Sequence, residues 1–182
     1  ACLVGMSERL AEPVVLTNVP DIGDVQVTMD MLQDLGATVV RNGDRVTVNA
    51  SSLRSNEVTE AFSRKNRIPI LLFGPLLARF GEAKIPALGG CKIGARPVDF
   101  HIEALRKMGV EIECDGAYHA KAAKGLKGAV IELPFPSVGA TENSMLAAVL
   151  ANGTTIIQNA AVEPEILDLA KRSALSSRFP SA

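Results

Sequence analysis

The sequence predicts an α/β protein built from repeated strand–helix–hairpin–helix units, and an internal repeat carries this prediction. Residues 27–43 (Val-Thr-Met-Asp-Met-Leu-Gln-Asp-Leu-Gly-Ala-Thr-Val-Val-Arg-Asn-Gly) align without a gap with residues 100–116 (Phe-His-Ile-Glu-Ala-Leu-Arg-Lys-Met-Gly-Val-Glu-Ile-Glu-Cys-Asp-Gly). In both copies a helical spacing of apolar residues changes to alternation, which indicates a helix followed by strands. Such a repeat is typical of folds whose units bury their apolar faces against one another.

Each copy contains a helix and then a β-hairpin. One helical stripe is apolar in each copy, formed by Ile22, Val25, Met29 and Leu32 in the first and by Val98, Ile102, Leu105 and Met108 in the second. Gly36 and Gly109 follow these helices, where glycine easily takes the left-handed conformation that ends a helix. The predicted strands, at residues 38–40 and 45–48 and at residues 111–113 and 118–122, flank Asn-Gly and Asp-Gly turns that favour hairpins.

A third, partial copy follows the second. Residues 150–159 resemble residues 10–18 with one extra residue, and a helix is expected at residues 163–171. Between the copies, residues 57–73 and 141–150 are expected to form mainly buried helices. Residues 1–11 have the spacing of the back half of a helix, and periodicity is lost after residue 171. We therefore expect a partial domain at residues 1–171 and a disordered tail at residues 172–182.

Composition excludes several classes of function. The 182 residues carry 19 Lys+Arg and 20 Asp+Glu, and only 4% are aromatic, so neither a basic footprint nor a stacking platform for nucleic acid is expected. Three cysteines and two histidines without a Cys-x-x-Cys pair offer too few ligands for zinc. The apolar run at residues 68–78 is too short to span a bilayer. We expect a soluble, cytoplasmic protein with no metal, cofactor, nucleic-acid or membrane partner.

The segment at residues 89–99, Gly-Gly-Cys-Lys-Ile-Gly-Ala-Arg-Pro-Val-Asp, is the strongest candidate for chemistry. Glycines on both sides of Cys91 predict an exposed loop, and Lys92 and Arg96 place cations near the thiol, which favours the thiolate. The alternative is an exposed thiol without a role. Cys114 falls on a predicted strand, where we expect it to be packed, and Cys2 is assigned no role.

Two further candidates could bind an anion. Arg67 precedes the apolar run, and with Arg96 it could clamp a phosphate or carboxylate, although a solvated basic cluster is the alternative. The turn at residues 137–139, Ser-Val-Gly, precedes a predicted helix whose first N–H groups are free for an anion. Simple helix capping explains the same residues. His101 is expected to be structural or on the surface.

The loop at residues 89–99 resembles the active-site loop of UDP-N-acetylglucosamine 1-carboxyvinyltransferases, the enolpyruvyl transferases that begin peptidoglycan synthesis. Residues 72–81 (Leu-Phe-Gly-Pro-Leu-Leu-Ala-Arg-Phe-Gly), 137–143 (Ser-Val-Gly-Ala-Thr-Glu-Asn) and 153–166 are similar to further family segments in the same order. The resemblance covers about residues 5–171. It implies an inside-out α/β barrel fold, and phosphoenolpyruvate and UDP-N-acetylglucosamine as substrates.

The resemblance also implies roles for individual residues. Cys91 would be the catalytic general acid, form a covalent adduct with phosphoenolpyruvate, and be the target of fosfomycin. Arg67 would hold phosphoenolpyruvate, and Arg96 would bind phosphate. The UDP-N-acetylglucosamine site would be lined by Arg96, Pro97, Val98, Asp99, Ser137, Val138 and Gly139.

The sequence departs from the family in ways that bear on activity. A Lys-Asn pair that precedes the matched region in the family is absent, as is the second domain with its general-base Asp and a further phosphate-binding Arg. The rival hypothesis is therefore a binding module that holds a UDP-sugar without catalysis. A relative of the shikimate-pathway enolpyruvyl transferase is a second alternative, which the Gly-Gly-Cys loop disfavours.

Cys91 should be the most reactive of the three cysteines toward a small alkylating agent at neutral pH, because the glycines expose its sulfur and the cations stabilise its thiolate. Cys114 should react slowly if the strand buries it. Mass-spectrometric mapping after brief labelling measures the three rates, and equal labelling of Cys2 and Cys91 would contradict the loop hypothesis.

Overall fold

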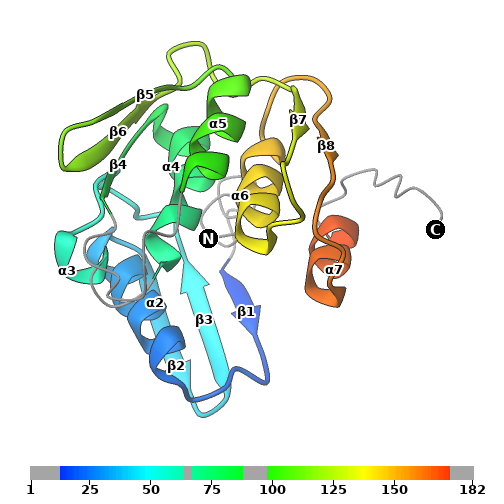
Figure 1. Cartoon of the computed structure of the whole chain (residues 1–182). Helices are drawn as coiled ribbons and strands as arrows, with labels where there is room; N and C mark the ends of the chain where they lie inside the picture. Colours follow the sequence, from blue (N-terminus) through cyan, green and yellow to red (C-terminus); the bar gives the residue numbers. More distant parts are fainter. Residues whose placement is uncertain (1–12, 64–66, 88–97, 173–182) are drawn as a thin grey trace.

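The two complete copies of the repeat fold into two sheets with the same strand order. The computed structural model describes residues 13–63, 67–87 and 98–172 (Figure 1). The first part contains β1 (Val14–Leu16), α2 (Gly23–Asp34), β2 (Thr38–Asn42), β3 (Arg45–Asn49), α3 (Glu60–Ser63), the 3-10 helix η1 (Ile68–Leu72) and α4 (Phe73–Phe80). The second part contains β4 (Glu82–Pro86), α5 (Asp99–Lys107), β5 (Glu111–Cys114), β6 (Ala117–Lys121), β7 (Val130–Glu132), α6 (Val138–Ala148), β8 (Ile156–Gln158) and α7 (Pro164–Arg172).

In each complete unit the hairpin's second strand lies between its first strand and the strand that precedes the helix. The orders are β1-β3-β2 and β4-β6-β5, and every pairing is antiparallel. The predicted glycine positions are confirmed: Gly36 and Gly109 end their helices at φ +104° and +88°. The hairpin turns contain Gly43 at φ +61° and Gly116 at φ +104°.

The third unit is recognisable from its backbone. β8 pairs in parallel with β7, and α7 follows β8 as α2 follows β1. Asn18 and Asn159, which the sequence alignment places in equivalent positions, are the described non-glycine residues with positive φ, at 58° and 53°. An asparagine tolerates this left-handed conformation better than most residues do. The shared backbone conformation therefore supports the third copy.

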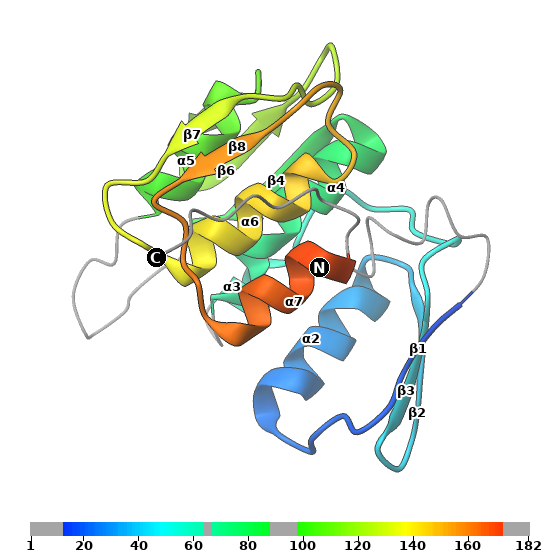
Figure 2. The ribbon, with the colours of Figure 1, turned by 90° about the vertical axis from the view of Figure 1, so that its right-hand side faces the viewer.

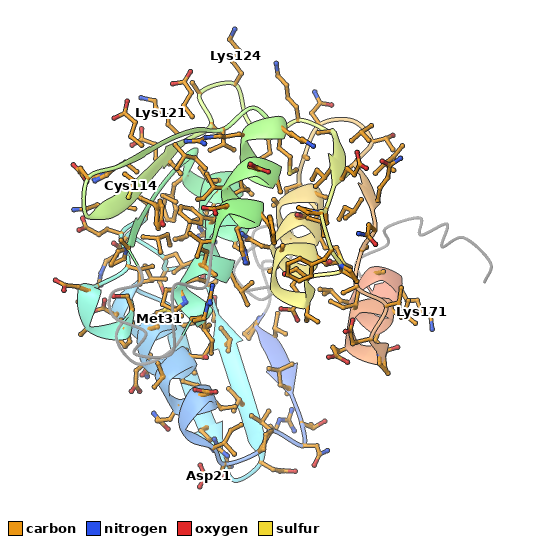
Figure 3. All side chains as sticks on the ribbon, viewed as in Figure 1. Asp21, Met31, Cys114, Lys121, Lys124 and Lys171 are labelled. Atoms are coloured by element: carbon orange, nitrogen blue, oxygen red, sulfur yellow. The ribbon has the colours of Figure 1, made fainter. Side chains whose placement is uncertain are left out.

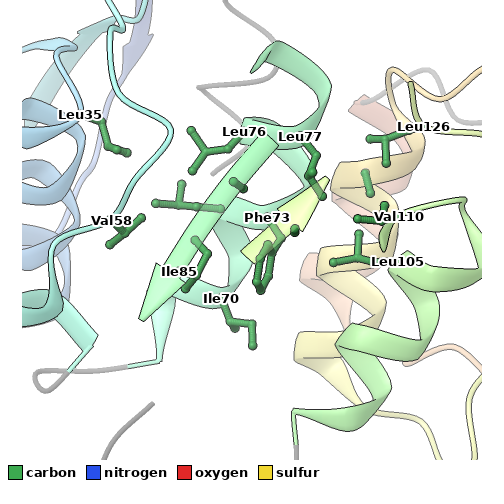
Figure 4. Packing of buried hydrophobic residues seen from close by; sticks show 14 of the residues in the cluster. Leu35, Val58, Ile70, Phe73, Leu76, Leu77, Ile85, Leu105, Val110 and Leu126 are labelled. Atoms are coloured by element: carbon green, nitrogen blue, oxygen red, sulfur yellow. The ribbon is translucent and has the colours of Figure 1, made fainter. Parts of the chain in front are cut away.

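Three of the helices lie in the middle of the molecule, with the sheets outside them (Figure 1). Figures 1 and 2 show α4, α5 and α6 in the middle of the molecule, with the three sheets around them. The core is formed where these helices meet the inner faces of the sheets, and Figure 4 shows Phe73 and Leu77 of α4 packed near Leu105 of α5. Phe73 is fully buried and makes an edge-to-face contact with Tyr118 of β6, with ring centroids 6.2 Å apart.

The predicted helix at residues 57–73 is only partly correct. The chain instead forms the short α3, then η1, and then α4, which begins at Phe73. Pro69 explains the break, because proline lacks an N–H and disfavours helical geometry at the preceding residue. Pro75 lies in the first turn of α4, where a missing N–H is tolerated. Ile22 also departs from the predicted stripe, since it precedes α2 and is 53% exposed.

α6 begins earlier than the sequence predicts, at residue 138 rather than 141. Ser137 is its N-cap, and the Ser137 Oγ accepts a hydrogen bond from the Ala140 N–H at 3.4 Å. In the part of the chain that the structure describes, no helix is long and apolar enough to cross a membrane.

Substituting Gly74 with alanine should destabilise the protein by about 1–3 kcal/mol, because the helices cannot accommodate another carbon. A Cβ at Gly74 would lie 2.7 Å from the Ala147 N and 3.0 Å from the Ala147 Cα, on the facing side of α6. The free energy of unfolding in urea measures the effect.

Gly23→Ala is the matched control, since a Cβ at Gly23 would meet nothing within 4 Å. It should leave stability unchanged or raise it by less than about 1 kcal/mol. Equal effects of the two substitutions would show that α4 and α6 do not pack this closely.

Candidate functional site

A hollow of about 570 Å³ opens where the repeat units meet. Its walls come from the start of α2, from η1, from the first turn of α5, and from the segment that leads into α6. The residues that line it are Asp24, Arg67, Ile68, Ile70, Leu71, Phe100, His101, Phe135, Ser137 and Gly139. The floor is therefore largely apolar, while polar groups stand at a few positions, as in many small-molecule sites.

The N-terminus of α6 forms one polar wall. Ser137 accepts from the Ala140 N–H, and the Thr141 hydroxyl donates to the Ser137 carbonyl at 2.7 Å. Among the described residues, none accepts a hydrogen bond from the N–H of Val138 or Gly139. Free N–H groups at a helix N-terminus, together with the helix dipole, favour an anion.

His101 stands against this helix end. Its side chain comes from the first turn of α5 and is 7% exposed. A Cβ on Gly139 would lie 3.4 Å from the His101 Cε1 and 3.6 Å from its Nε2, so the imidazole and the first turn of α6 are in contact. On its other side, the His101 Nδ1 is 3.2 Å from the Asn143 Nδ2 of α6.

Burial makes His101 a neutral imidazole at physiological pH. Loss of solvation, followed by the positive charge of Arg67, lowers the pKa of His101 from 6.5 to about 4. The Asn143 Nδ2 faces the His101 Nδ1, and an amide NH2 can only donate, so this arrangement favours the tautomer with the ring hydrogen on Nε2. Sequence reasoning did not select His101 as a functional residue. The sequence signal that could have indicated its burial is its place beside the apolar stripe formed by Val98, Ile102 and Leu105.

Arg67 supplies the cation. It directly precedes η1, it is half-buried, and its side chain lines the hollow. Its guanidinium makes no hydrogen bond or ion pair with any residue that the structure describes. A half-buried guanidinium without a protein partner is suited to a bidentate bond with phosphate or carboxylate.

The structure brings together some of the predicted residues and separates others. Arg67, Ser137 and Gly139 line the hollow. Val138 instead packs against the small apolar cluster between α6 and α7. Val98 is the buried N-cap of α5, and Asp99, the first residue of that helix, is exposed.

The loop residues Cys91, Arg96 and Pro97 lie outside the described residues. The described chain stops at Ala87, just after β4, and resumes at Val98, just before α5. Phe100 and His101 line the hollow directly after this point. The C-terminal end of this segment therefore joins the described chain within a few residues of the hollow.

Two aromatic residues that sequence reasoning missed close one side of the hollow. Phe100 and Phe135 meet edge to face, with centroids 5.1 Å apart and an interplanar angle of 80°. Phe135 remains 52% exposed, so it offers an open apolar surface beside the helix N-terminus. Phe135 lies between two prolines, in a segment without helical or strand periodicity, so the sequence did not indicate that it would line a site.

The prediction that Cys114 is buried is wrong. Cys114 is exposed and is a free thiol at the end of β5, on the periphery of the molecule in Figure 3. Ile112, two residues earlier, shares its face of the strand and is buried. The core ends before the hairpin turn, so alternation alone did not indicate the exposure of Cys114. No group of three or more His, Cys, Asp or Glu side chains in the described ranges could hold a metal.

Comparisons with known proteins show close relatives. A family model described as EPSP synthase (3-phosphoshikimate 1-carboxyvinyltransferase) matches residues 7–172. The UDP-N-acetylglucosamine 1-carboxyvinyltransferase of Ruegeria pomeroyi is 49% identical over 176 residues, which cover 94% of this chain and 42% of the relative. The protein of the same name from Protochlamydia amoebophila is 50% identical over 160 residues, covering 84% of this chain and 34% of its own length.

Solved structures share the fold. The enolpyruvyl transferase NikO from Streptomyces tendae has a TM-score of 0.79 at 21% identity, covering 95% of this chain and 41% of its own. EPSP synthase from Acinetobacter baumannii has a TM-score of 0.67 at 18% identity, covering 93% and 40%. The predicted α/β fold of repeated units is confirmed. The chain spans about two-fifths of the length of the Ruegeria relative that it matches.

Acid should destabilise the fold partly through His101. As its pKa is 6.5 in ordinary surroundings and about 4 in the folded chain, the unfolded chain takes up the proton first. The stabilising contribution is therefore complete above the unfolded pKa and is lost as the pH falls toward the folded one. Between about pH 7 and about pH 5 the expected loss is about 2 kcal/mol.

Urea unfolding at the two pH values measures this loss, and His101→Gln should reduce it. His119→Gln is the control, since His119 is exposed and its Nε2 is 3.0 Å from the Asp115 carboxylate. An acid sensitivity that His101→Gln leaves unchanged would contradict the assignment.

Proposed function

Because the chain belongs to the EPSP synthase family of enolpyruvyl transferases, we propose that it forms one substrate-binding wall and carries the loop cysteine of a UDP-N-acetylglucosamine 1-carboxyvinyltransferase site. The reaction would transfer the enolpyruvyl group of phosphoenolpyruvate to the 3-hydroxyl of the sugar. The high identity to curated relatives of that name supports this choice over the shikimate-pathway enzyme.

The observation that carries the proposal is the convergence of three anion-binding features on one hollow. The first N–H groups of α6 and the guanidinium of Arg67, which have no hydrogen-bond partner among the described residues, meet there with the neutral imidazole of His101. Both substrates bring phosphoryl groups, and phosphoenolpyruvate adds a carboxylate. The open Phe135 ring offers an apolar surface next to these groups, which suits a nucleotide sugar.

In this proposal the remaining roles follow from the resemblance. Cys91, as a general acid, would protonate the methylene carbon of phosphoenolpyruvate. The sugar 3-hydroxyl would then bond to the neighbouring carbon while its proton passes to the general base of the second domain. Loss of a proton from the methyl group and of phosphate then restores the double bond. Arg67 and Arg96 would hold phosphoenolpyruvate and its phosphate. Arg96, Pro97, Val98, Asp99 and the turn at residues 137–139 would contact UDP-N-acetylglucosamine.

The proposal has wider consequences. The activity would be the first committed step of peptidoglycan synthesis, in the cytoplasm, and would connect the chain to cell-wall formation, cell shape and cell division. Fosfomycin would act on Cys91. Residues 1–171 would form part of one domain, and a second domain would supply the general base. Residues 172–182 would be a disordered tail.

A non-catalytic UDP-sugar-binding module is the second candidate. It is favoured by one observation: the chain spans about 42% of the Ruegeria relative, yet its anion-binding hollow is built within the described residues. Catalysis would require groups from the rest of the relative's length, and each electrostatic group lost from such a site costs roughly 100–1,000-fold in rate.

The chain should bind UDP-N-acetylglucosamine weakly and show no measurable enolpyruvyl transfer by itself. Amide NMR during titration should show saturable shifts at Val138, Gly139 and His101. In a separate titration, Arg67→Met should weaken the binding of phosphoenolpyruvate by roughly ten-fold, because a charged hydrogen bond is lost. Arg45→Met is the matched control, since Arg45 is an exposed arginine on β3.

Shifts that do not saturate, or an affinity for phosphoenolpyruvate that Arg67→Met leaves unchanged, would contradict the proposed site. Activity is measured as phosphate release from phosphoenolpyruvate. Release that depends on UDP-N-acetylglucosamine and disappears in Cys91→Ser would show that this chain is catalytic without further segments.

A further inference from the structure

We propose that His101 is a neutral hydrogen-bond donor to a phosphoryl oxygen bound at the N-terminus of α6, and that Asn143 is the positioning residue that keeps the imidazole in its Nε2–H form. This inference deepens the proposed function and rests on it. It assigns to His101 a binding role that its place in the amino-acid sequence did not indicate.

The two ring nitrogens of His101 have different neighbours. The His101 Nδ1 lies 3.2 Å from the Asn143 Nδ2, inside the contact between α5 and α6. The His101 Nε2 is on the opposite side of the ring, next to Gly139 in the first turn of α6. No residue in the described part of the chain forms a hydrogen bond with this Nε2, and the side chain lines the hollow. His101 as a residue is 7% exposed, and its Nε2 lies beside the first turn of α6, whose Val138 and Gly139 N–H groups have no acceptor among the described residues.

Asn143 is itself held firmly. It is 1% exposed, and its neighbour Ser144 donates from its hydroxyl to the Ala140 carbonyl at 2.7 Å. The Asn143 Oδ1 is buried without a hydrogen-bond partner among the described residues. Because an amide does not titrate, the Asn143 NH2 that faces Nδ1 remains a donor at every pH and favours the neutral ring with its hydrogen on Nε2. The Nε2 hydrogen is therefore set by packing rather than by pH.

The charges around His101 favour the neutral ring. Arg67 from η1 and Asp24 from α2 are the charged residues that line the hollow. Helix α6 faces His101 with Asn143 and Gly139. The acidic residue of this helix, Glu142, is instead near enough to Glu165 of α7 for the two carboxylates to repel each other. The exposed charged residues on α5 and on the strands packed against it are Asp99, Glu103, Arg106, Lys107, Glu111, Glu113 and Glu132.

A neutral donor has a physical advantage beside Arg67. An imidazolium would place a second positive charge next to the guanidinium and at the positive end of the α6 dipole. A neutral Nε2–H completes the coordination of a phosphoryl oxygen without this repulsion. Burial, with the Arg67 charge, holds the pKa of His101 at about 4, so affinity for a ligand of constant charge should not change across neutral pH.

Nitrogen-15 NMR of the two histidines tests the tautomer directly. His101 should show hydrogen on Nε2 and no titration from about pH 5 to about pH 8, and its Nε2 signal should move when UDP-N-acetylglucosamine is added. His119 is the internal control, because it is exposed and next to Asp115. Hydrogen on the His101 Nδ1, or an Nε2 signal that neither UDP-N-acetylglucosamine nor phosphoenolpyruvate changes, would overturn the inference.

Substitutions test the role in binding. His101→Phe keeps a planar ring but removes the donor, and it should weaken binding by roughly ten-fold. His101→Gln, which keeps an N–H donor, should recover part of the loss, and His119→Gln should have no effect. Measuring UDP-N-acetylglucosamine and phosphoenolpyruvate separately identifies whose phosphoryl group is bound, since only that ligand should lose affinity.

Asn143→Asp should make ligand affinity depend on the protonation of His101. A carboxylate at this position would accept from Nδ1–H and stabilise the imidazolium, so the affinity for UDP-N-acetylglucosamine should rise as the pH falls from about 8 to about 5. Wild type should remain flat over this range. If wild type binds neither substrate, the proposed function fails and the inference fails with it. If wild type binds and His101→Phe binds equally well, only the inference is overturned.

Discussion

The close approach of α4 to α6 is the constraint on which the other contacts depend. A Cβ at Gly74 would lie 2.7 Å from the Ala147 backbone nitrogen, so only glycine allows the two helices to be this near. Around this contact the inner faces of the sheets close, and fully buried side chains such as Phe73 and Leu76 fill the space. A wider separation would open a void in the core and move α6 away from α5.

The position of α6 in turn builds the hollow. The same helix presents Ser137 and Gly139 to the hollow, holds His101 through Asn143, and accepts the Ala161 N–H on the Thr141 hydroxyl at 3.1 Å. Packing of the core and binding of an anion are therefore properties of one helix. Because α6 serves both the core and the hollow, it carries buried polar residues, among them Asn143 and Ser144, in an otherwise apolar interior.

Much of the fold could be predicted, because turn glycines and the repeat are local signals. Gly36, Gly43, Gly109 and Gly116 all take the expected positive φ. The helical prediction for residues 57–73 overlooked the local signal of Pro69. The exposure of Cys114 was missed because it depends on where the core ends rather than on periodicity. For the site, Arg67, Ser137 and Gly139 were predicted and line the hollow. His101 was not, because its role comes from contacts with Asn143 and Gly139, which are distant in sequence.

A crystal structure of the chain with UDP-N-acetylglucosamine is the most direct test of the central claim. The account predicts that a phosphoryl oxygen lies within hydrogen-bonding distance of the Gly139 N–H and the His101 Nε2. A nucleotide sugar bound elsewhere on the molecule, with the hollow filled only by water, would contradict it.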